Sequence, residues 1–358
     1  MLDKSFQNII NRYKRVRSFR QLNETYKNHY ALMGLGNHSL NNILPVIQYL
    51  QIPLKYIYCT SRKKAELIEQ KYRGVKGTHS LQEILEDDNI KGVFVATSPE
   101  SHFEIAQEVL NSRKALFIEK PPCKDSKQLD FLIDLANRQT ENNVVVGLQK
   151  RFAPCTQILK KELKKNARVH SYHYRYLTGL YPEGDPVLDL FIHPIDHVNA
   201  LFGKSQIKSI TFIQGQSNGR ISIFLVLEHE NITGQLELST CYSWQGCKDE
   251  LEINTSKGIY SLDKMSSLVF SPKQQSVMGI PLEKVYRKSQ HRVILYETNQ
   301  AIPIIANNAI LSQGYFPEVK AFVDLVEKNK KTGNAGKLSS LKDTYHILDE
   351  IRKMSRHS

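Results

Sequence analysis

A glycine-rich turn near the N-terminus is the segment of this sequence with the clearest chemical potential. An apolar, strand-like run ends at Met33, residues 34–39 read GLGNHS, and an apolar helical pattern follows. Glycines at positions 34 and 36 permit a tight turn and let backbone N–H groups approach a pyrophosphate at the N-terminus of the helix, where the dipole favours negative charge. An ordinary glycine turn between a strand and a helix is the alternative interpretation. We predict dinucleotide contacts from Gly34, Gly36, Asn37, His38 and Ser39.

The end of the second strand-like run bears on which dinucleotide would bind. Many NAD-dependent enzymes place an acidic side chain there, because a carboxylate accepts hydrogen bonds from the ribose 2′-hydroxyl. Residues 60–64 of this chain read TSRKK, which offers hydroxyl groups and fixed positive charge suited to a 2′-phosphate. A solvated, basic start of a helix would look the same. The segment favours NADP(H), leaves NAD(H) possible, and predicts contacts from Thr60, Ser61, Arg62 and Lys63.

The elements that would carry these two segments alternate between strand and helix. The apolar pattern predicts strands at 29–33, 54–59, 92–96, 115–118 and 143–146. Helical patterns lie between or after them, at 40–50, 63–72, 81–85, 103–112 and 127–139. Strands that are separated by helices indicate parallel βαβ units, so the first 150 residues read as an α/β domain.

The texture of the sequence changes after residue 150. Predicted strands follow one another without intervening helices at 169–177, 207–214, 221–228, 234–240 and 250–255. This succession indicates a mostly antiparallel sheet, with a helix near 185–202 before most of it. Residues 315–328 and 338–354 return to helical periodicity, and we expect them to pack back onto the body of the protein.

Length and composition restrict the class of protein. A chain of 358 residues suggests two domains, and 41% hydrophobic with 24% charged residues is ordinary for a globular protein. The sequence contains no apolar run near the roughly 18 residues that span a bilayer, and its N-terminus lacks a secretory apolar stretch. Five cysteines without close pairs predict reduced thiols and neither a disulfide framework nor a metal site. We therefore expect a cytoplasmic protein with no membrane partner.

The net charge of +13 permits a nucleic-acid partner, but no zinc-finger spacing or aromatic RNA-binding motif accompanies it. Residues 1–29 are basic, and helical spacing of apolar residues predicts an amphipathic helix there. We interpret that helix as a solvated basic face rather than a nucleic-acid or lipid contact, and we expect no nucleic-acid partner. The apolar residues at helical spacing are Phe6, Ile9, Ile10, Tyr13 and Val16.

Four further segments, in order and at characteristic spacing, carry a resemblance to a known family. They are VFVATSPESH at 93–102, FIEKP at 117–121, GLQKRF at 147–152 and LDLFIHPID at 188–196. Together with the glycine turn they resemble the glucose-fructose oxidoreductase and inositol dehydrogenase (Gfo/Idh/MocA) family over most of residues 30–203. Two departures stand in the last segment: Phe191 replaces a frequent glycine, and Pro194 falls inside the expected helix.

The resemblance implies a fold and a division of the chain. The expected fold is an α/β Rossmann N-terminal domain plus an α+β C-terminal domain with a mostly antiparallel open sheet. We expect a basic helical extension at 1–29, the dinucleotide-binding domain at 30–150 and the substrate domain at 151–358. The resemblance also implies cofactor contacts from Thr97, Pro99, His102, Glu119 and Lys120.

By the same resemblance, Lys120, Asp189 and His193 match the catalytic positions of sugar and inositol dehydrogenases. Removal of a hydride from a carbinol is feasible only if the hydroxyl proton leaves as the carbonyl forms, so a base must lie beside the substrate. Histidine titrates near neutrality, and a partly desolvated lysine has a lowered pKa. Asp189 would orient the ring of His193 across one helical turn, while Pro194 would kink that helix. Which of Lys120 and His193 transfers the proton stays open.

The expected substrate is a small polyhydroxylated molecule, namely a sugar, sugar derivative or cyclitol. Arg175 and Tyr176 are candidate substrate contacts together with Asp196, and Tyr172 and Tyr174 are alternatives. Strand alternation allows only one side of strand 169–177 to face the substrate, and which side does so stays open. Two alternatives are a reductase of an imine or conjugated acceptor on the same fold, and a non-catalytic dinucleotide sensor. We also expect a homo-oligomer, either a dimer or a tetramer, by analogy.

Overall fold

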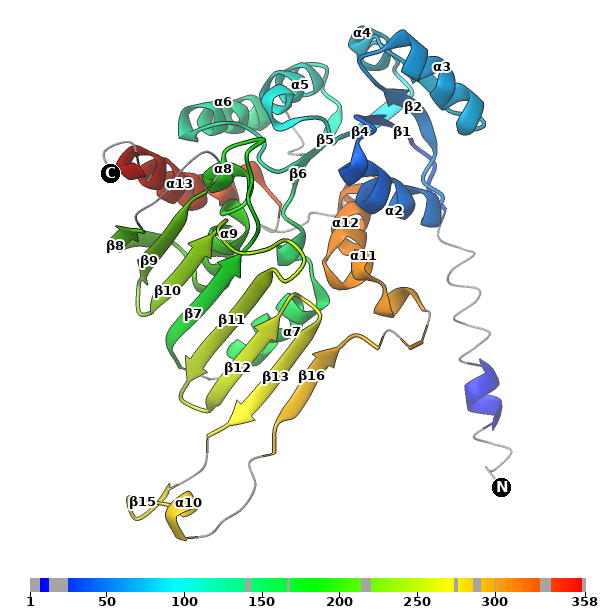
Figure 1. Cartoon of the computed structure of the whole chain (residues 1–358). Helices are drawn as coiled ribbons and strands as arrows, with labels where there is room; N and C mark the ends of the chain where they lie inside the picture. Colours follow the sequence, from blue (N-terminus) through cyan, green and yellow to red (C-terminus); the bar gives the residue numbers. More distant parts are fainter. Residues whose placement is uncertain are drawn as a thin grey trace.

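Two β-sheets organise the chain, a smaller one drawn in blue to cyan and a larger one in green to orange (Figure 1). The structure is a computed structural model. Within the residues that it describes, no helix is both long and apolar enough to cross a membrane. The described residues are 7–12, 25–138, 143–165, 168–213, 220–273, 276–285, 291–299, 301–302, 304–328 and 336–355.

The first sheet has six parallel strands in the order β3-β2-β1-β4-β5-β6. Its central strands are apolar runs buried on both faces, as expected for a parallel sheet covered by helices. The strand order reverses between β1 and β4, where doubly wound sheets bind their ligands. The bounds are β1 His29–Met33, β2 Leu54–Tyr58, β3 Lys76–Thr78, β4 Ile90–Val95, β5 Ala115–Glu119 and β6 Val144–Gly147.

The expected α/β domain is therefore present, with one strand that the sequence did not predict. Strand β3 has three residues and no apolar run, so its periodicity carries no signal. The helix after β1 also differs, because it opens with a π-helical turn, η1 (Ser39–Ile43), before α2 (Leu44–Tyr49). Pro45 lacks an N–H and crowds the preceding turn, which accounts for this widening. The remaining helices are α3 Arg62–Lys71, α4 Leu81–Leu85, α5 Pro99–Asn111 and α6 Ser126–Asn137.

The second sheet has eight strands in the order β16-β13-β12-β11-β7-β10-β9-β8. Only the β7–β10 pair is parallel, which confirms the mostly antiparallel sheet. Strands β12, β13 and β16 were not predicted, because each contains an apolar run of at most four residues. The bounds are β7 Val169–Leu177, β8 Ser205–Phe212, β9 Ser222–His229, β10 Thr233–Ser239, β11 Lys248–Thr255, β12 Gly258–Asp263, β13 Ser267–Pro272 and β16 Val293–Glu297.

Helices from distant parts of the chain pack against the two sheets and connect them. Helix α12 (Tyr315–Lys328) returns to the first sheet, where Phe322 packs against Phe94 and Phe117 with ring centroids 4.9 and 5.8 Å apart. Helix α13 (Lys342–Ser355) contacts α6 and α9 (Ile192–Phe202). A short helical turn, η2 (Gln149–Arg151), and α7 (Pro154–Leu163) lead from β6 into the second sheet.

The segment predicted as one helix with a kink at Pro194 consists of two helices. Helix α8 (Pro186–Asp189) ends before Leu190, and α9 (Ile192–Phe202) begins two residues later. A proline inside a helix would collide with the carbonyl four residues earlier, which here belongs to Leu190. The break therefore lies one turn ahead of Pro194, and the proline occupies the first turn of α9, where its missing N–H costs nothing.

At the N-terminus the structure describes a helical segment over residues 7–12 only. This segment contains Ile9 and Ile10 of the predicted amphipathic helix. Phe6, Tyr13 and Val16 lie outside the described residues. The division of the chain at residues 29 and 150 stays a prediction.

Candidate active site

The glycine turn lies between β1 and η1 at the carboxyl edge of the first sheet. Gly34 has φ 92°, and a Cβ atom there would lie 2.5 Å from the carbonyl oxygen of Ala96. A Cβ on Gly36 would meet no atom within 4 Å, so the second glycine borders open space. The hydroxyl of Ser39 donates to the Gly34 and Gly36 carbonyl oxygens at 2.9 and 3.1 Å. Gly34 thus shapes the turn, while the space beside Gly36 suits a phosphate that approaches the backbone.

A basic rim follows β2 beside this turn. Ser61 caps α3, whose first turn contains no acidic residue. The ammonium of Lys64 donates to the Leu35 carbonyl oxygen at 3.1 Å and so connects the rim to the glycine turn. Arg62 is exposed and pairs with Glu66 at 3.3 Å. Hydroxyl groups and cations, with no acidic residue in that turn, fit a 2′-phosphate. Lys64 joins the residues that the sequence predicted as contacts of the dinucleotide.

Glu119 at the end of β5 connects the FIEKP segment to the glycine turn. Its Oε1 lies 3.1 Å from Nε2 of His38, and Glu119 itself is only 4% exposed. A Cβ on Gly147 would come within 2.9 Å of the Glu119 carboxylate, so this glycine makes room for it. Tyr315 of α12 packs on His38 with ring centroids 5.6 Å apart. The predicted cofactor residues His38 and Glu119 therefore lie together, and α12 supplies a neighbour that the sequence did not indicate.

His102, another predicted cofactor residue, is buried in the scaffold. Its Nδ1 lies 2.8 Å from the carbonyl oxygen of Pro121, and its Nε2 lies 3.1 Å from that of Thr97. The imidazole thus bridges the loop after β4 and the loop after β5. Thr97 is partly buried and Pro99, the first residue of α5, is exposed at the same edge of the sheet. The side chain of His102 therefore stabilises this edge of the sheet from within.

Lys120 joins the two sheets at this edge. Its ammonium donates a hydrogen bond of 2.8 Å to the main-chain carbonyl oxygen of Asp189. Burial lowers the pKa of Lys120, and the carboxylates of Glu119 and Asp189 only partly oppose that shift. A lysine with a lowered pKa exchanges its proton more readily near neutral pH, as general acid–base chemistry requires.

Asp189 does not orient His193, which corrects the sequence-based expectation. Its Oδ2 accepts hydrogen bonds from the Tyr181 hydroxyl at 3.2 Å and from the Asp185 N–H at 3.1 Å. Because α8 ends at Asp189, the one-turn helical spacing to His193 is lost at the break. Asp189 acts instead through its main-chain oxygen, which positions Lys120.

His193 lies in the first turn of α9. Among the described residues, no hydrogen-bond partner engages its imidazole, which leaves both ring nitrogens for a ligand. Burial lowers the pKa of His193 well below its ordinary value, and the cations of Lys120 and Lys150 lower it further. The ring is therefore neutral at pH 7 and can accept a proton or a hydrogen bond.

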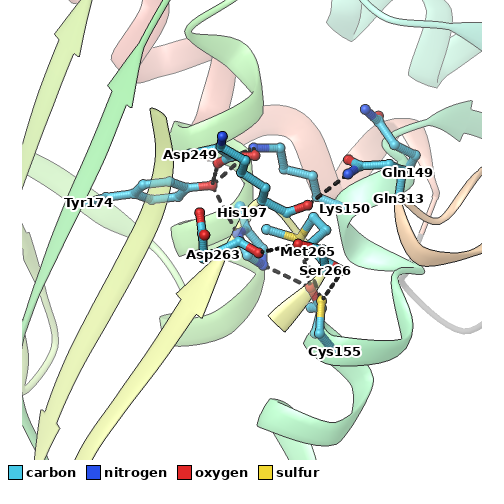
Figure 2. Close-up of polar contacts among 12 residues, drawn as sticks. Gln149, Lys150, Cys155, Tyr174, His197, Asp249, Asp263, Met265, Ser266 and Gln313 are labelled. Atoms are coloured by element: carbon cyan, nitrogen blue, oxygen red, sulfur yellow. Dashed lines mark hydrogen bonds and ion pairs between the residues drawn. The ribbon is translucent and has the colours of Figure 1, made fainter. Parts of the chain in front are cut away.

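A polar cluster that includes Lys150 and His197 lies on the inner face of the second sheet (Figure 2), and both of these residues lower the pKa of His193. Lys150 from η2 contacts both carboxylate oxygens of Asp249 at 2.7 Å and the Tyr174 hydroxyl at 3.0 Å. The Tyr174 hydroxyl donates to Asp249 at 2.8 Å and lies 3.4 Å from Nδ1 of His197. Lys150 stands in the GLQKRF segment, yet its role was missed because Asp249 lies 99 positions away in the sequence.

The structure separates the predicted substrate contacts. The ring of Tyr176 lies under the ammonium of Lys150 at 4.9 Å, on the inner face of the sheet. Arg175 points to the opposite face, where it pairs with Glu237 at 2.9 Å and with Glu250 at 3.4 Å. Asp196 is 2% exposed and forms a buried ion pair with Arg151. Strand alternation thus turns Arg175 to the face opposite Tyr176, and ion pairing gives Asp196 a structural partner in Arg151.

Comparison with known proteins identifies a family and relatives that this chain resembles. Residues 28–148 match the oxidoreductase family with an NAD-binding Rossmann fold, GFO_IDH_MocA. The putative oxidoreductase YceM of Salmonella typhimurium is 25% identical over 66% of this chain and 76% of its own. An inositol 2-dehydrogenase of Acidothermus cellulolyticus is 23% identical over 44% of this chain, and the match spans 48% of that enzyme.

Two solved structures share the fold. A dehydrogenase from Chromobacterium violaceum superposes with a TM-score of 0.77 at 16% identity, over 92% of this chain and 96% of its own. The 3-ketoreductase KijD10 from Actinomadura kijaniata, solved with NADP and TDP-benzene, gives a TM-score of 0.71 at 14% identity, over 91% and 97%. At these identities the likeness concerns the fold alone.

Proposed function

We propose that this chain, whose residues 28–148 match the GFO_IDH_MocA oxidoreductase family, transfers a hydride between NADP(H) and a carbinol or keto carbon of a sugar, sugar derivative or cyclitol. The observation that carries the proposal is the placement of Lys120. Its ammonium is held by the Asp189 carbonyl oxygen at the sheet edge that also bears the glycine turn, and the unengaged imidazole of His193 lies close enough for Lys120 to shift its pKa.

The cofactor site of the proposal comprises the glycine turn and the basic rim. Open space beside Gly36 admits a pyrophosphate, and Ser61, Arg62 and Lys63 supply donors and charge for a 2′-phosphate. The 3-ketoreductase KijD10, whose fold this chain shares, was solved with NADP. When bound, the nicotinamide carries the hydride, and the protein's own residues manage the proton.

In the reductive direction, Lys120 donates its proton to the carbonyl oxygen of the substrate as that carbon becomes a carbinol. In the oxidative direction, neutral Lys120 takes the hydroxyl proton back, so the two directions balance. His193, which is neutral, donates a hydrogen bond to the same oxygen. It can also exchange the transferred proton with Lys120. Lys150 and Tyr176 face the substrate from the inner side of the second sheet, whereas Arg175 and Asp196 are not part of the proposed site.

The cofactor arm of the test is a titration that follows NADPH and NADH fluorescence. We expect tighter binding of NADPH. Ser61→Asp should reverse this order, because aspartate also caps helices but repels a 2′-phosphate and accepts from a 2′-hydroxyl. Tighter binding of NADH by the wild type would contradict the NADP(H) assignment.

The catalytic arm is a panel of polyols and keto sugars. Lys120→Ala and His193→Ala should each lower kcat/KM by roughly 10²–10⁴, the usual contribution of a general acid–base group. Lys124→Ala and His346→Ala serve as matched controls, because both side chains are exposed. Equal turnover by the Lys120 and His193 variants and the wild type would remove the assignment.

We further infer a cytoplasmic homo-oligomer. Several exposed apolar side chains lie on strands of the large sheet, and burial between copies is a common use of such side chains. The cysteines are free, which suits a reducing compartment. Light scattering that gives a monomer would contradict the oligomer. These side chains are Phe224, Ile259, Val293 and Ile294, each at least 37% exposed.

A further inference from the structure

An exposed indole stands next to the candidate active site. Trp244, the only tryptophan in the sequence, lies in the loop between β10 and β11 and is 51% exposed. This loop runs beside the one that follows β7, since the N–H of Tyr242 donates to the Thr178 carbonyl oxygen at 2.9 Å. Both loops lie at the end of the large sheet that is nearer the first sheet (Figure 1).

The indole is held in one orientation despite its exposure. Its Nε1–H donates to the Leu180 carbonyl oxygen at 2.9 Å. A Cβ on Gly179 would lie 2.4 Å from Cδ1 of Trp244, so the ring rests directly on the glycine backbone. A large aromatic surface that is already ordered loses little conformational entropy when a ligand covers it.

Tyr181 and Asp189 connect this ring to Lys120. Trp244 packs edge to face against Tyr181, with ring centroids 6.5 Å apart at 63°. The Tyr181 hydroxyl donates to Oδ2 of Asp189, whose carbonyl oxygen holds Lys120. If the reacting carbon of a ligand lies at Lys120, the part of that ligand that extends beyond Tyr181 would therefore contact the indole.

The charges around this path favour a neutral, hydroxylated ligand. Besides burial, the groups that act most strongly on Tyr181 are the carboxylates of Asp189, Glu183 and Glu100, all of which raise its pKa. Carboxylates accept hydrogen bonds from hydroxyl groups and repel phosphates. The C–H face of a sugar ring complements the negative face of an aromatic ring, so the same surface binds a saccharide well.

We propose that Trp244 and Tyr181 form a stacking platform for a second, uncharged sugar ring, so that the substrate is a glycoside of at least two rings. This inference rests on the proposed function and narrows its substrate class. It places one ring at Lys120 and His193 and the next against the indole. A nucleotide sugar would instead carry phosphates into the carboxylate-rich segment.

The single tryptophan makes the test direct, because its emission reports only this site. The NADP⁺-loaded protein is titrated with glucose, galactose, mannose and N-acetylglucosamine, with their α- and β-1,4-linked disaccharides, and with UDP-glucose. We expect at least one disaccharide to change the emission at concentrations about tenfold below those of its parent monosaccharide, a difference of about 1.4 kcal/mol. Turnover of the same compounds is measured in parallel.

Two variants separate stacking from folding. Trp244→Ala should lower the kcat/KM ratio of disaccharide to monosaccharide by about tenfold, while monosaccharide kcat/KM changes less than about twofold. Gly179→Ala should have the same effect with the tryptophan retained, because its methyl group displaces the indole. Trp244→Phe should restore part of the ratio.

The proposal is overturned if no disaccharide binds better than its parent, if Trp244→Ala lowers both kcat/KM values equally, or if UDP-glucose binds most tightly. Failure of the proposed function looks different. In that case no compound is turned over and NADP⁺ binding is absent, whatever the emission of Trp244 does.

Discussion

The side-chain ammonium of Lys120 and the main-chain carbonyl oxygen of Asp189 lie 2.8 Å apart, in a hydrogen bond that joins the last turn of α8 to the loop after β5. This bond fixes the lysine at the junction of the two sheets without engaging it in an ion pair. The ammonium keeps two further N–H donors for a substrate oxygen.

The lowered pKa of Lys120 predicts a pH limit in the reductive direction. Burial destabilises the ammonium, so the lysine loses its proton at a pH below the ordinary lysine value of about 10.4. The reductive kcat/KM should therefore be constant at neutral pH and should decline on the alkaline side before that value. Lys120→Arg should lack this decline, because a guanidinium does not titrate there; a persistent decline would contradict the role.

The lowered pKa of His193 predicts the behaviour on the acid side. Burial and neighbouring cations disfavour the imidazolium, so the ring stays neutral as the pH falls through about 6.5, the ordinary histidine value. The reductive kcat/KM, which requires protonated Lys120 and neutral His193, should hold through that region and fall only at lower pH. His193→Gln, whose amide is a neutral hydrogen-bonding group, should shift or remove the acid limb. An unchanged limb would assign it to another residue.

The two glycines of the turn should respond differently to the same substitution. Gly36→Ala adds a methyl group into open space, so the fold should persist while the Kd for NADPH rises about tenfold or more. Gly34→Ala adds one at φ 92° and 2.5 Å from the Ala96 carbonyl oxygen, which should destabilise the fold by about 1–3 kcal/mol. Urea unfolding and NADPH titration distinguish these effects. Equal losses of stability would refute the separation.

The buried Arg151–Asp196 pair should contribute to the stability of the fold rather than to substrate binding. Asp196→Ala leaves a guanidinium that is 3% exposed without its carboxylate, and we expect a loss of about 3–5 kcal/mol in the free energy of unfolding. Glu66→Ala breaks the exposed pair with Arg62 and should cost less than about 1 kcal/mol. Urea denaturation measures both, and a small effect of Asp196→Ala would restore it as a candidate substrate contact.

Local pattern was sufficient for much of the fold. Strand β7 and helices α4 and α12 fall at the predicted residues, because period-2 and period-3.6 apolar spacing reports which side chains become buried. The glycine turn was also readable, since the backbone conformation at Gly34 depends on the residue itself. Strand β3 was not predicted, because three residues are too few to show a periodicity.

The arrangement of the candidate site depended on contacts between distant segments. Lys120 was identifiable as a chemical group, but its partner turned out to be the main chain of Asp189, 69 residues away. Asp196 was expected at the substrate and is instead neutralised by Arg151. Lys150 acquired its importance from Asp249 of β11. The spacing of residues indicates which side chains of one helix or strand are buried. Which charged or hydrogen-bonding groups pair with one another depends on groups from distant segments, and only the packing of the two sheets decides it.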